Sequence, residues 1–287
     1  MIETRLFHIS SLSGIQHNGS KLSSMSFYLP SFIKWEDDVK AIYFSVLKAE
    51  VPTSFYLINE YNNTISIQTS NGTSNYTLTE GNYNVNTFMT AMTSLLGSNY
   101  SFSYNSITNK MTMSSNQSFT ILTENTTMSR FLGISDEENI SSVNNSITSP
   151  YVCNFLPIQR LHFRTPDLYL DSYNAYDKSN DSILLLQNTT SNLGVITYSN
   201  TSNLKVLIDI DFLESVNIRI TDDKNRSLNF HNVHWHLTFQ IDYEYNDFPL
   251  RNSLNNFFKL YRKSLAKTFF ENQLDNNDEN VENDENL

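Results

Sequence analysis

Hydrophobic and polar residues follow two different periods along this chain, and the change of period is clearest between residues 76 and 134. Tyr76–Asn84 alternates briefly and turns at Gly81, which predicts a short strand and a turn. Residues 85–96 instead carry apolar side chains at helical spacing, with Asn84 placed to cap the helix and Gly97 to end it. The apolar positions of this predicted helix are Val85, Phe88, Met89, Met92, Leu95 and Leu96.

Beyond the predicted helix the pattern returns to alternation. Aromatic residues alternate with serines over 100–104, and methionines alternate with polar residues over 111–113, which predicts a β-hairpin. Another strand is expected at 119–122. One or two helical turns are expected at 128–134, closed by Gly133. This block therefore predicts a small unit of helices and strands.

The order of these signals resembles a module of penton proteins, the minor capsid proteins of virophages and of related polinton-type DNA elements. The pattern is Leu-x-Glu-Gly-x-Tyr, an amphipathic helix, a Phe-x-Tyr hairpin and Phe-Leu-Gly, and it covers about a fifth of the chain. Taken singly, each residue also has an ordinary interpretation as a turn glycine or a core side chain. The residues that carry the resemblance are Leu78, Glu80, Gly81, Tyr83, Phe88, Leu95, Phe102, Tyr104, Phe131, Leu132 and Gly133.

Outside this block, short apolar segments are joined by polar loops, with no alternating helices, which favours an antiparallel sandwich over a parallel sheet. Lys40–Val51 is apolar on both faces and is predicted to be a central strand. Val233–Glu244 alternates apolar and polar residues, which predicts a strand with one apolar face and one polar face that meets solvent. Residues 135–150 are predicted to be a loop. The other predicted strands are Ser24–Leu29, Phe55–Asn59, Gln159–Thr165, Leu168–Leu170, Ile183–Leu186, Val195–Ser199, Leu204–Phe212 and Val216–Thr221.

The strand order is implied by the resemblance, since pentons of this kind look like jelly rolls that carry an inserted domain. The expected fold is dominated by β-structure: a single jelly-roll β-sandwich with an inserted small α+β domain. Residues 1–61 would form the first part of the jelly roll, 62–149 the inserted domain and 150–250 the second part. Residues 251–287 would form a basic helix and an acidic tail.

The C-terminal segment has two contrasting parts. Arg251–Phe270 carries Leu254, Phe257, Phe258, Tyr261 and Leu265 on roughly one helical face, with Lys and Arg around it. It is interpreted either as a terminal helix packed on its own domain or as a basic arm. Such an arm would dock on a neighbouring capsid subunit or face packaged DNA. Glu271–Leu287 is rich in Asn, Asp and Glu and is expected to be disordered.

Composition excludes several classes of protein. The net charge of −11 disfavours nonspecific nucleic-acid binding by the folded body. Cys153 is the only cysteine, so no disulfide framework exists, and it is interpreted as a small buried hydrophobe. No signal peptide or apolar run of membrane-spanning length occurs, so a soluble, non-secreted protein without a membrane span is expected.

The strongest candidate for chemistry is the histidine cluster His231, His234 and His236. A His-x-His pair on a strand places two imidazoles on one face, as in many metal sites. A third ligand is missing. Two residues of strand span about 6.6 Å, so Asp242 and Glu244, further along the same face, lie too far from the histidines to share an ion. Surface or inter-subunit histidines are the favoured interpretation over a metal site.

Other catalytic patterns are weaker still. Asp209 and Asp211 share one face of a predicted strand, as a pair of carboxylates for glycoside hydrolysis would, but surface carboxylates are the simpler interpretation. No motif names a base that would activate Cys153, and no glycine-rich phosphate loop occurs. No catalytic, cofactor-binding or metal-binding residue is therefore predicted, and no cofactor.

The resemblance implies a structural, non-enzymatic protein that forms homopentamers at the five-fold vertices of an icosahedral DNA virus or virophage capsid. Its implied partners are copies of itself, a major capsid protein of the double jelly-roll type and a host-surface receptor met by the inserted domain. Its implied location is the virion, after assembly in the infected cell. Two alternatives stay open: a viral attachment module that binds a receptor or glycan, and a jelly-roll metal- or carbohydrate-active enzyme.

Overall fold

The structure is a computed structural model of the 287-residue chain, and it describes residues 1–34, 36, 38–170, 181–191, 193–210, 212–246, 257–258 and 261. Strands dominate it, and helices are few and short. Antiparallel pairing predominates between the described strands. No helix among the described residues is long and apolar enough to cross a membrane.

The first large sheet has its strands in the order β1-β18-β4-β16-β13, with β15 also paired to β4. The strand β4 lies between β18 and β16, which confirms the predicted central strand, and its inward residues Ile42, Phe44 and Val46 are buried. The strands are β1 (Ile2–Ser10), β4 (Val39–Pro52), β13 (Tyr169–Leu170), β15 (Val195–Ser199), β16 (Val206–Asp209) and β18 (His236–Tyr245).

The second large sheet has the order β14-β12-β17-β3-β2. Alternation along β17 buries Val216, Ile218 and Ile220 on one face, as the period of two predicts. The strands are β2 (Ile15–Gln16), β3 (Ser24–Lys34), β12 (Arg160–Arg164), β14 (Ser182–Gln187) and β17 (Phe212–Thr221).

The two large sheets share a core around Trp235, the residue that precedes β18. Its fully buried ring lies edge-on to Phe27 of β3, at 5.8 Å, and to Phe163 of β12, at 5.9 Å. In the first sheet, Phe239 stacks on Phe7 at 4.9 Å and on Phe44 at 5.2 Å. Side chains of both sheets therefore meet in one aromatic core.

Contacts divide the chain into two compact units. The larger consists of the described residues within 4–35 and 42–242, and the smaller consists of those within 1–3, 36–41 and 243–287. Within the smaller unit the Asn246 amide donates to the Asp38 carbonyl at 2.9 Å, and the Lys40 ammonium lies 2.5 Å from the Glu244 carboxylate.

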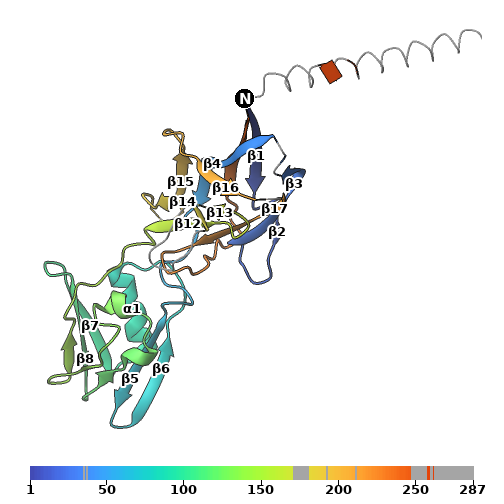
Figure 1. The fold of residues 1–287 in the computed structure, drawn as a ribbon. Helices are drawn as coiled ribbons and strands as arrows, with labels where there is room; N and C mark the ends of the chain where they lie inside the picture. Colours follow the sequence, from blue (N-terminus) through green and yellow to red (C-terminus); the bar gives the residue numbers. More distant parts are fainter. Residues whose placement is uncertain are drawn as a thin grey trace, which may run out of the picture. The chain divides into compact units, whose positions relative to one another are not determined.

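Residues 64–148 form a separate group of sheets and helices, seen in Figure 1 as β5, β6, β7, β8 and α1. A four-stranded sheet has the order β10-β9-β5-β6, and a three-stranded sheet has the order β11-β8-β7. The elements are β5 (Thr64–Thr69), β6 (Gly72–Thr77), α1 (Val85–Leu96), β7 (Tyr100–Asn105), β8 (Lys110–Ser115), β9 (Thr120–Ile121), η1 (Thr123–Asn125), α2 (Ser129–Leu132), β10 (Ile140–Ser141) and β11 (Ser146–Thr148).

The helix α1 begins and ends where its sequence predicts. The Asn84 side chain accepts a hydrogen bond from the Thr87 amide, and the Thr87 hydroxyl accepts one from the Asn84 amide, which forms a capping box. Gly97 ends the helix at a φ of 85°. The buried face comprises Phe88, Met92 and Leu96, part of the predicted apolar stripe.

The core of this group includes three phenylalanines from separate segments, and one of them, Phe155, lies beyond residue 148. Phe88 of α1 lies 6.0 Å from Phe131 of α2 and 5.2 Å from Phe155, measured between ring centroids. Gly133 ends α2 in the left-handed region, at a φ of 67°, and a Cβ there would lie 2.5 Å from the Tyr151 carbonyl oxygen. Glycine is therefore required by both the backbone conformation and the close approach.

Several predicted elements are wrong or shifted. Phe55–Asn59 is no strand: only Ile58 pairs, with Gly81. An asparagine side chain takes the place of a strand partner beside Ile58: the Asn62 side-chain amide donates to the Leu57 carbonyl at 3.1 Å. Residues 135–150 are not simply a loop, since β10 and β11 lie there.

The short strand predicted within Tyr76–Asn84 also differs, because β6 ends at Thr77. The last strand begins at His236 rather than Val233. The sequence pattern did not indicate β1, β2 or the hairpin of β5 and β6. The described residues of the predicted C-terminal helix, Phe257, Phe258 and Tyr261, are helical and exposed, and the rest of 251–287 lies outside the described residues.

Candidate functional site

The histidine cluster lies in the turn before β18, and its three side chains have different surroundings. His231 and Asn232 both have positive φ, at 48° and 62°, so the chain bends sharply there. The His231 ring packs on the Tyr56 ring with centroids 3.9 Å apart. Its Nε2 atom is buried, with no hydrogen-bond partner within the described part of the chain.

His234 belongs to a hydrogen-bonded clasp centred on Ser11. The Ser11 hydroxyl oxygen accepts the Trp235 amide at 3.0 Å and lies 3.0 Å from His234 Nδ1. The Ser11 amide donates in turn to the Trp235 carbonyl at 3.0 Å. This arrangement ties the end of β1 to the start of β18, so the role of His234 here is structural.

The acids that follow on β18 are engaged with other protein groups. Asp242 is 2% exposed, although it lies on the face that the sequence predicts to be wet. It accepts hydrogen bonds from the Thr4 hydroxyl and the Gln240 amide, each at 2.6 Å, and forms an ion pair with Lys205. Burial alone would raise the pKa of Asp242, but these hydrogen bonds and the Lys205 charge lower the pKa overall.

No three His, Cys, Asp or Glu side chains among the described residues form a group that could hold a metal ion. His236 is exposed at the start of β18, and His234 lies outside the strand, so the two do not form the strand pair that the sequence predicts. Asp209 is exposed at the end of β16, whereas Asp211 lies outside the described residues. The carboxylate pair therefore stays a sequence-based hypothesis.

Cys153 lies at the edge of the core of residues 57–155. Its amide donates to the Asn109 carbonyl at 2.7 Å. Burial raises the pKa of the thiol, and weaker hydrogen bonds with Ser149 and Met111 only partly offset this effect. A raised pKa leaves the thiol protonated near neutral pH, which makes it a poor nucleophile.

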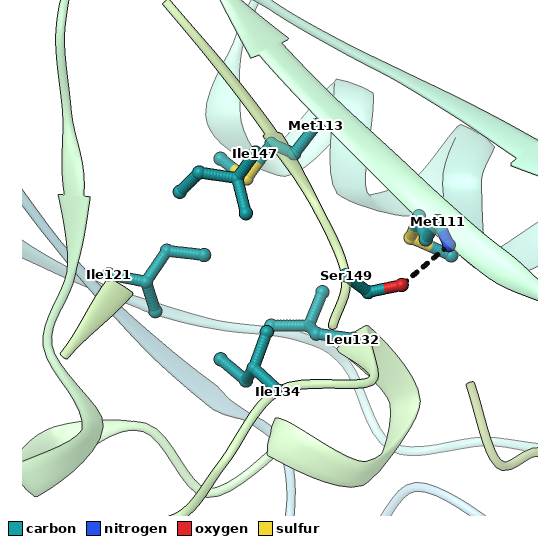
Figure 2. A pocket seen from close by; sticks show the side chains of 7 residues that line it. All are labelled: Met111, Met113, Ile121, Leu132, Ile134, Ile147 and Ser149. Carbon is teal, nitrogen blue, oxygen red and sulfur yellow. Dashed lines mark hydrogen bonds between the residues drawn. The ribbon is translucent and has the colours of Figure 1, made fainter. Parts of the chain in front are cut away.

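A small cavity lies in the same core, between the α2 region and strands β8, β9 and β11 (Figure 2). Its volume is about 10 Å³, and Ser149 is its single polar lining residue. The Ser149 hydroxyl accepts the Met111 amide at 2.9 Å, as Figure 2 shows. A site this small and apolar is a packing void rather than a ligand site. The other lining residues are Met111, Met113, Ile121, Leu132, Ile134 and Ile147.

One buried charge that the sequence did not single out is Arg164. It is 0% exposed, its Nε donates to the Thr221 hydroxyl at 2.9 Å, and its guanidinium lies 2.8 Å from the Asp181 carboxylate. A register shift between Phe163 and Arg164 turns this side chain inward beside its apolar neighbour. Buried arginines of this kind are held by their partners, so we assign Arg164 a structural role.

His231 is expected to make stability depend on pH. Burial, the largest cause, lowers its pKa below the ordinary value of 6.5; nearby Lys21 also lowers the pKa, and Glu80 raises it in part. The folded protein therefore resists protonation of this ring. Stability is fully present above pH 6.5 and falls as the pH drops toward the folded-state pKa.

Urea unfolding at pH 7 and pH 5 tests this expectation. His231→Phe keeps a ring on Tyr56 and removes the titration, so it should lose less stability between the two pH values than the natural chain. His17→Gln, at an exposed position, is the control. An unchanged difference in His231→Phe would contradict the prediction.

Neither a protein-family model nor a curated protein matches the sequence. Among solved structures, the crystal structure of selenomethionine-labelled mavirus penton protein aligns with 85% of this chain and 100% of its own, at 14% identity and a TM-score of 0.44. A chain of the Sputnik virophage, solved by cryo-EM at 3.5 Å resolution, aligns with 84% of this chain and 97% of its own. The identity is 15% and the TM-score 0.37.

Proposed function

We propose that this chain is a penton-type minor capsid protein, a structural and non-enzymatic component of an icosahedral virion. The observation that carries the proposal is a small α+β group with its own core, interposed between β4 and β12 of an antiparallel sandwich. Most of the residues that carry the penton resemblance have packing roles in this group, and Leu78, Phe88, Phe131 and Leu132 are buried.

The proposed architecture is a single jelly roll, formed by residues 1–61 and 150–250, around an inserted domain at 62–149. The strand orders of the two large sheets are compatible with it, because neighbours in each sheet come from distant parts of the sequence. Residues 251–287 would follow as a helix and tail. In this arrangement the sandwich supplies the contacts between subunits, and the inserted domain is free to meet an external partner.

The proposed mechanism is contact rather than catalysis. Like subunits would pack side by side in a heterologous interface that closes into a ring of five at each vertex. The further partners would be a major capsid protein of the double jelly-roll type, around the ring, and a host-surface receptor for the inserted domain. The protein would be located at the capsid vertices.

The mass and symmetry of the purified chain test this proposal. Five copies of 33.1 kDa give about 165 kDa, so light scattering should report a particle of that mass, and negative-stain images should show five-fold rings. The measurement is repeated across salt concentrations and with capsid shells. A chain that neither forms rings of five nor joins shells would overturn the proposal, and a stable trimer would favour an attachment module instead.

A further inference from the structure

The two ends of the sandwich expose apolar side chains that nothing in the described chain covers. At one end, which we call the β1 flank, Leu6, Leu12, Ile15 and Tyr28 are 55%, 74%, 58% and 69% exposed. At the other, the β14 flank, Leu185, Leu193, Val195 and Leu204 are 53%, 81%, 52% and 65% exposed. Exposed apolar side chains that gather on one surface mark an interaction site.

Strand order places these flanks at opposite ends of the sheets. Among the described strands, β1 and β2 are terminal at one end of their sheets, while β14 is terminal at the other end of its sheet. The strand β15 lies beside β14. The two flanks therefore face different directions and have different sequences, which is the arrangement that a head-to-tail contact between copies requires.

The β1 flank contains a groove, and the β14 flank contains an uncharged, apolar strand. A groove of about 320 Å³ lies between β1 and β3, lined by Phe7 and Phe27 among others. The strand β14 reads Ser-Ile-Leu-Leu-Leu-Gln and is terminal in its sheet among the described strands. It lacks the charge or proline that discourages a strand from pairing with other chains.

Charge points to a second copy of this chain as the partner. Residues 182–204 contain no charged residue, although 17% of the chain is charged and 17% of 23 residues is about four. From Leu6 onward, residues 6–33 contain one charged residue, Lys21, which pairs with Glu60 at 3.3 Å, and the two histidines His8 and His17. Glu3 and Arg5 lie at the start of β1. Two chains of net charge −11 repel each other, so they approach most favourably through surfaces that carry almost no charge.

The available area suits such a contact. The nine residues of β1 extend about 30 Å, and two packed sheets with their side chains are roughly 20 Å thick, so each flank offers on the order of 600 Å². A standard interface buries about 800 Å² per partner, and in a ring each chain would use both flanks. Charged residues, among them Arg160 on β12 and Glu50 on β4, would lie at the rim.

From these observations we infer that the β1 flank of one copy binds the β14 flank of the next. This inference rests on the proposed ring of like subunits and names the surfaces that would form it. The exposed apolar side chains of the β14 flank fill or cover the groove between β1 and β3 of the neighbouring copy.

Two single substitutions and their mixture test the inference. Leu12→Asp places a charge on the β1 flank, and Leu185→Asp places one on the β14 flank. Ile107→Asp, at a 91% exposed position outside both flanks, is the matched control. All three positions are on the surface, and circular dichroism verifies that each variant folds.

Each flank variant alone is expected to need at least a tenfold higher protein concentration to assemble. The control Ile107→Asp should assemble at the same concentration as the natural chain. Mixing the two flank variants should restore one contact, because each retains the flank that the other has lost. The expected product is a heterodimer of about 66 kDa, twice 33.1 kDa, that grows no further. Analytical ultracentrifugation measures the mass of the two flank variants, the control and the mixture.

The outcomes separate this inference from the proposed function. Rings of five that form normally from both flank variants would overturn the flank assignment and leave the penton proposal standing. Heterodimers from the mixture, with natural rings of a number other than five, would support the flanks and overturn the penton proposal. A natural chain that stays at 33.1 kDa at every concentration would overturn the inference. The flanks would then be covered by something other than a second copy, such as the chain's own residues 251–270 or a capsid shell.

Discussion

Replacement of Trp235 by alanine is expected to lower the free energy of unfolding by about 3–5 kcal/mol through the cavity it leaves in the sandwich core. The fully buried indole packs on Phe27 and Phe163, and its Nε1 donates to the Leu22 carbonyl at 2.8 Å. Loss of that donor adds about 1–3 kcal/mol, because a buried acceptor is left without its partner. A domain is typically stable by about 5–15 kcal/mol, so this variant should be close to unfolded at physiological temperature.

Two further variants separate packing from hydrogen bonding. Trp235→Phe keeps a ring in the core and loses the donor, so it should cost clearly less than alanine. Val233→Ala, two residues away and 43% exposed in the natural chain, should change stability by about 0.5 kcal/mol or less. Urea unfolding followed by circular dichroism gives all three values. A cost below about 1 kcal/mol for Trp235→Ala would contradict the single shared core.

Phe88→Ala is expected to destabilise the group of residues 64–148 by about 3–5 kcal/mol and to leave the sandwich largely unaffected. Phe88 is fully buried, and its ring contacts Tyr83, Phe131 and Phe155 at centroid distances of 6.5, 6.0 and 5.2 Å. These aromatic contacts hold α1 against α2, so their removal should unfold the helices first. Ser94→Ala, on the exposed side of α1, is the control and should be almost neutral.

The natural chain provides a reporter for each region. Both tryptophans, Trp35 and Trp235, lie outside residues 62–149, whereas the one long described helix is α1. Tryptophan fluorescence therefore carries no signal from residues 62–149, and through the buried Trp235 it reports on the sandwich. The helical signal in circular dichroism reports on the group around α1. In Phe88→Ala the helical transition should move to lower urea while the fluorescence transition stays in place. Equal shifts in both signals would contradict the proposal of an inserted domain that folds as its own unit.

Local signals located the elements whose structure depends on neighbouring residues. The cap at Asn84, the apolar stripe of α1 and the stop at Gly97 were all predicted, and so was the hairpin of β7 and β8. Each of these depends on residues within one turn of helix or across one short turn. The central position of β4 was also predicted, because a strand buried on both faces is apolar throughout.

Candidate sites were harder to predict, since they depend on what a side chain meets. The sequence placed His234 and His236 together on a strand, but the structure ties His234 to Ser11 and leaves His236 exposed. The acid Asp242 sits on a face that alternation predicts to be wet. It is nevertheless buried, because Thr4 and Lys205, both remote in sequence, supply hydrogen bonds and charge.

By itself, then, the sequence determined the predominance of β-structure, the α+β block at residues 76–134 and its resemblance to pentons. Only the tertiary structure decided the short strands, the buried ion pairs and the two apolar flanks. Two-residue strands such as β9 and β10 carry no period and exist because Ile121 meets Ile140. The ion pair of Arg164 and Asp181 and the placement of β1 and β14 at sheet ends likewise depend on strand order. Strand order is set by contacts between distant residues, whose free energy no local pattern expresses.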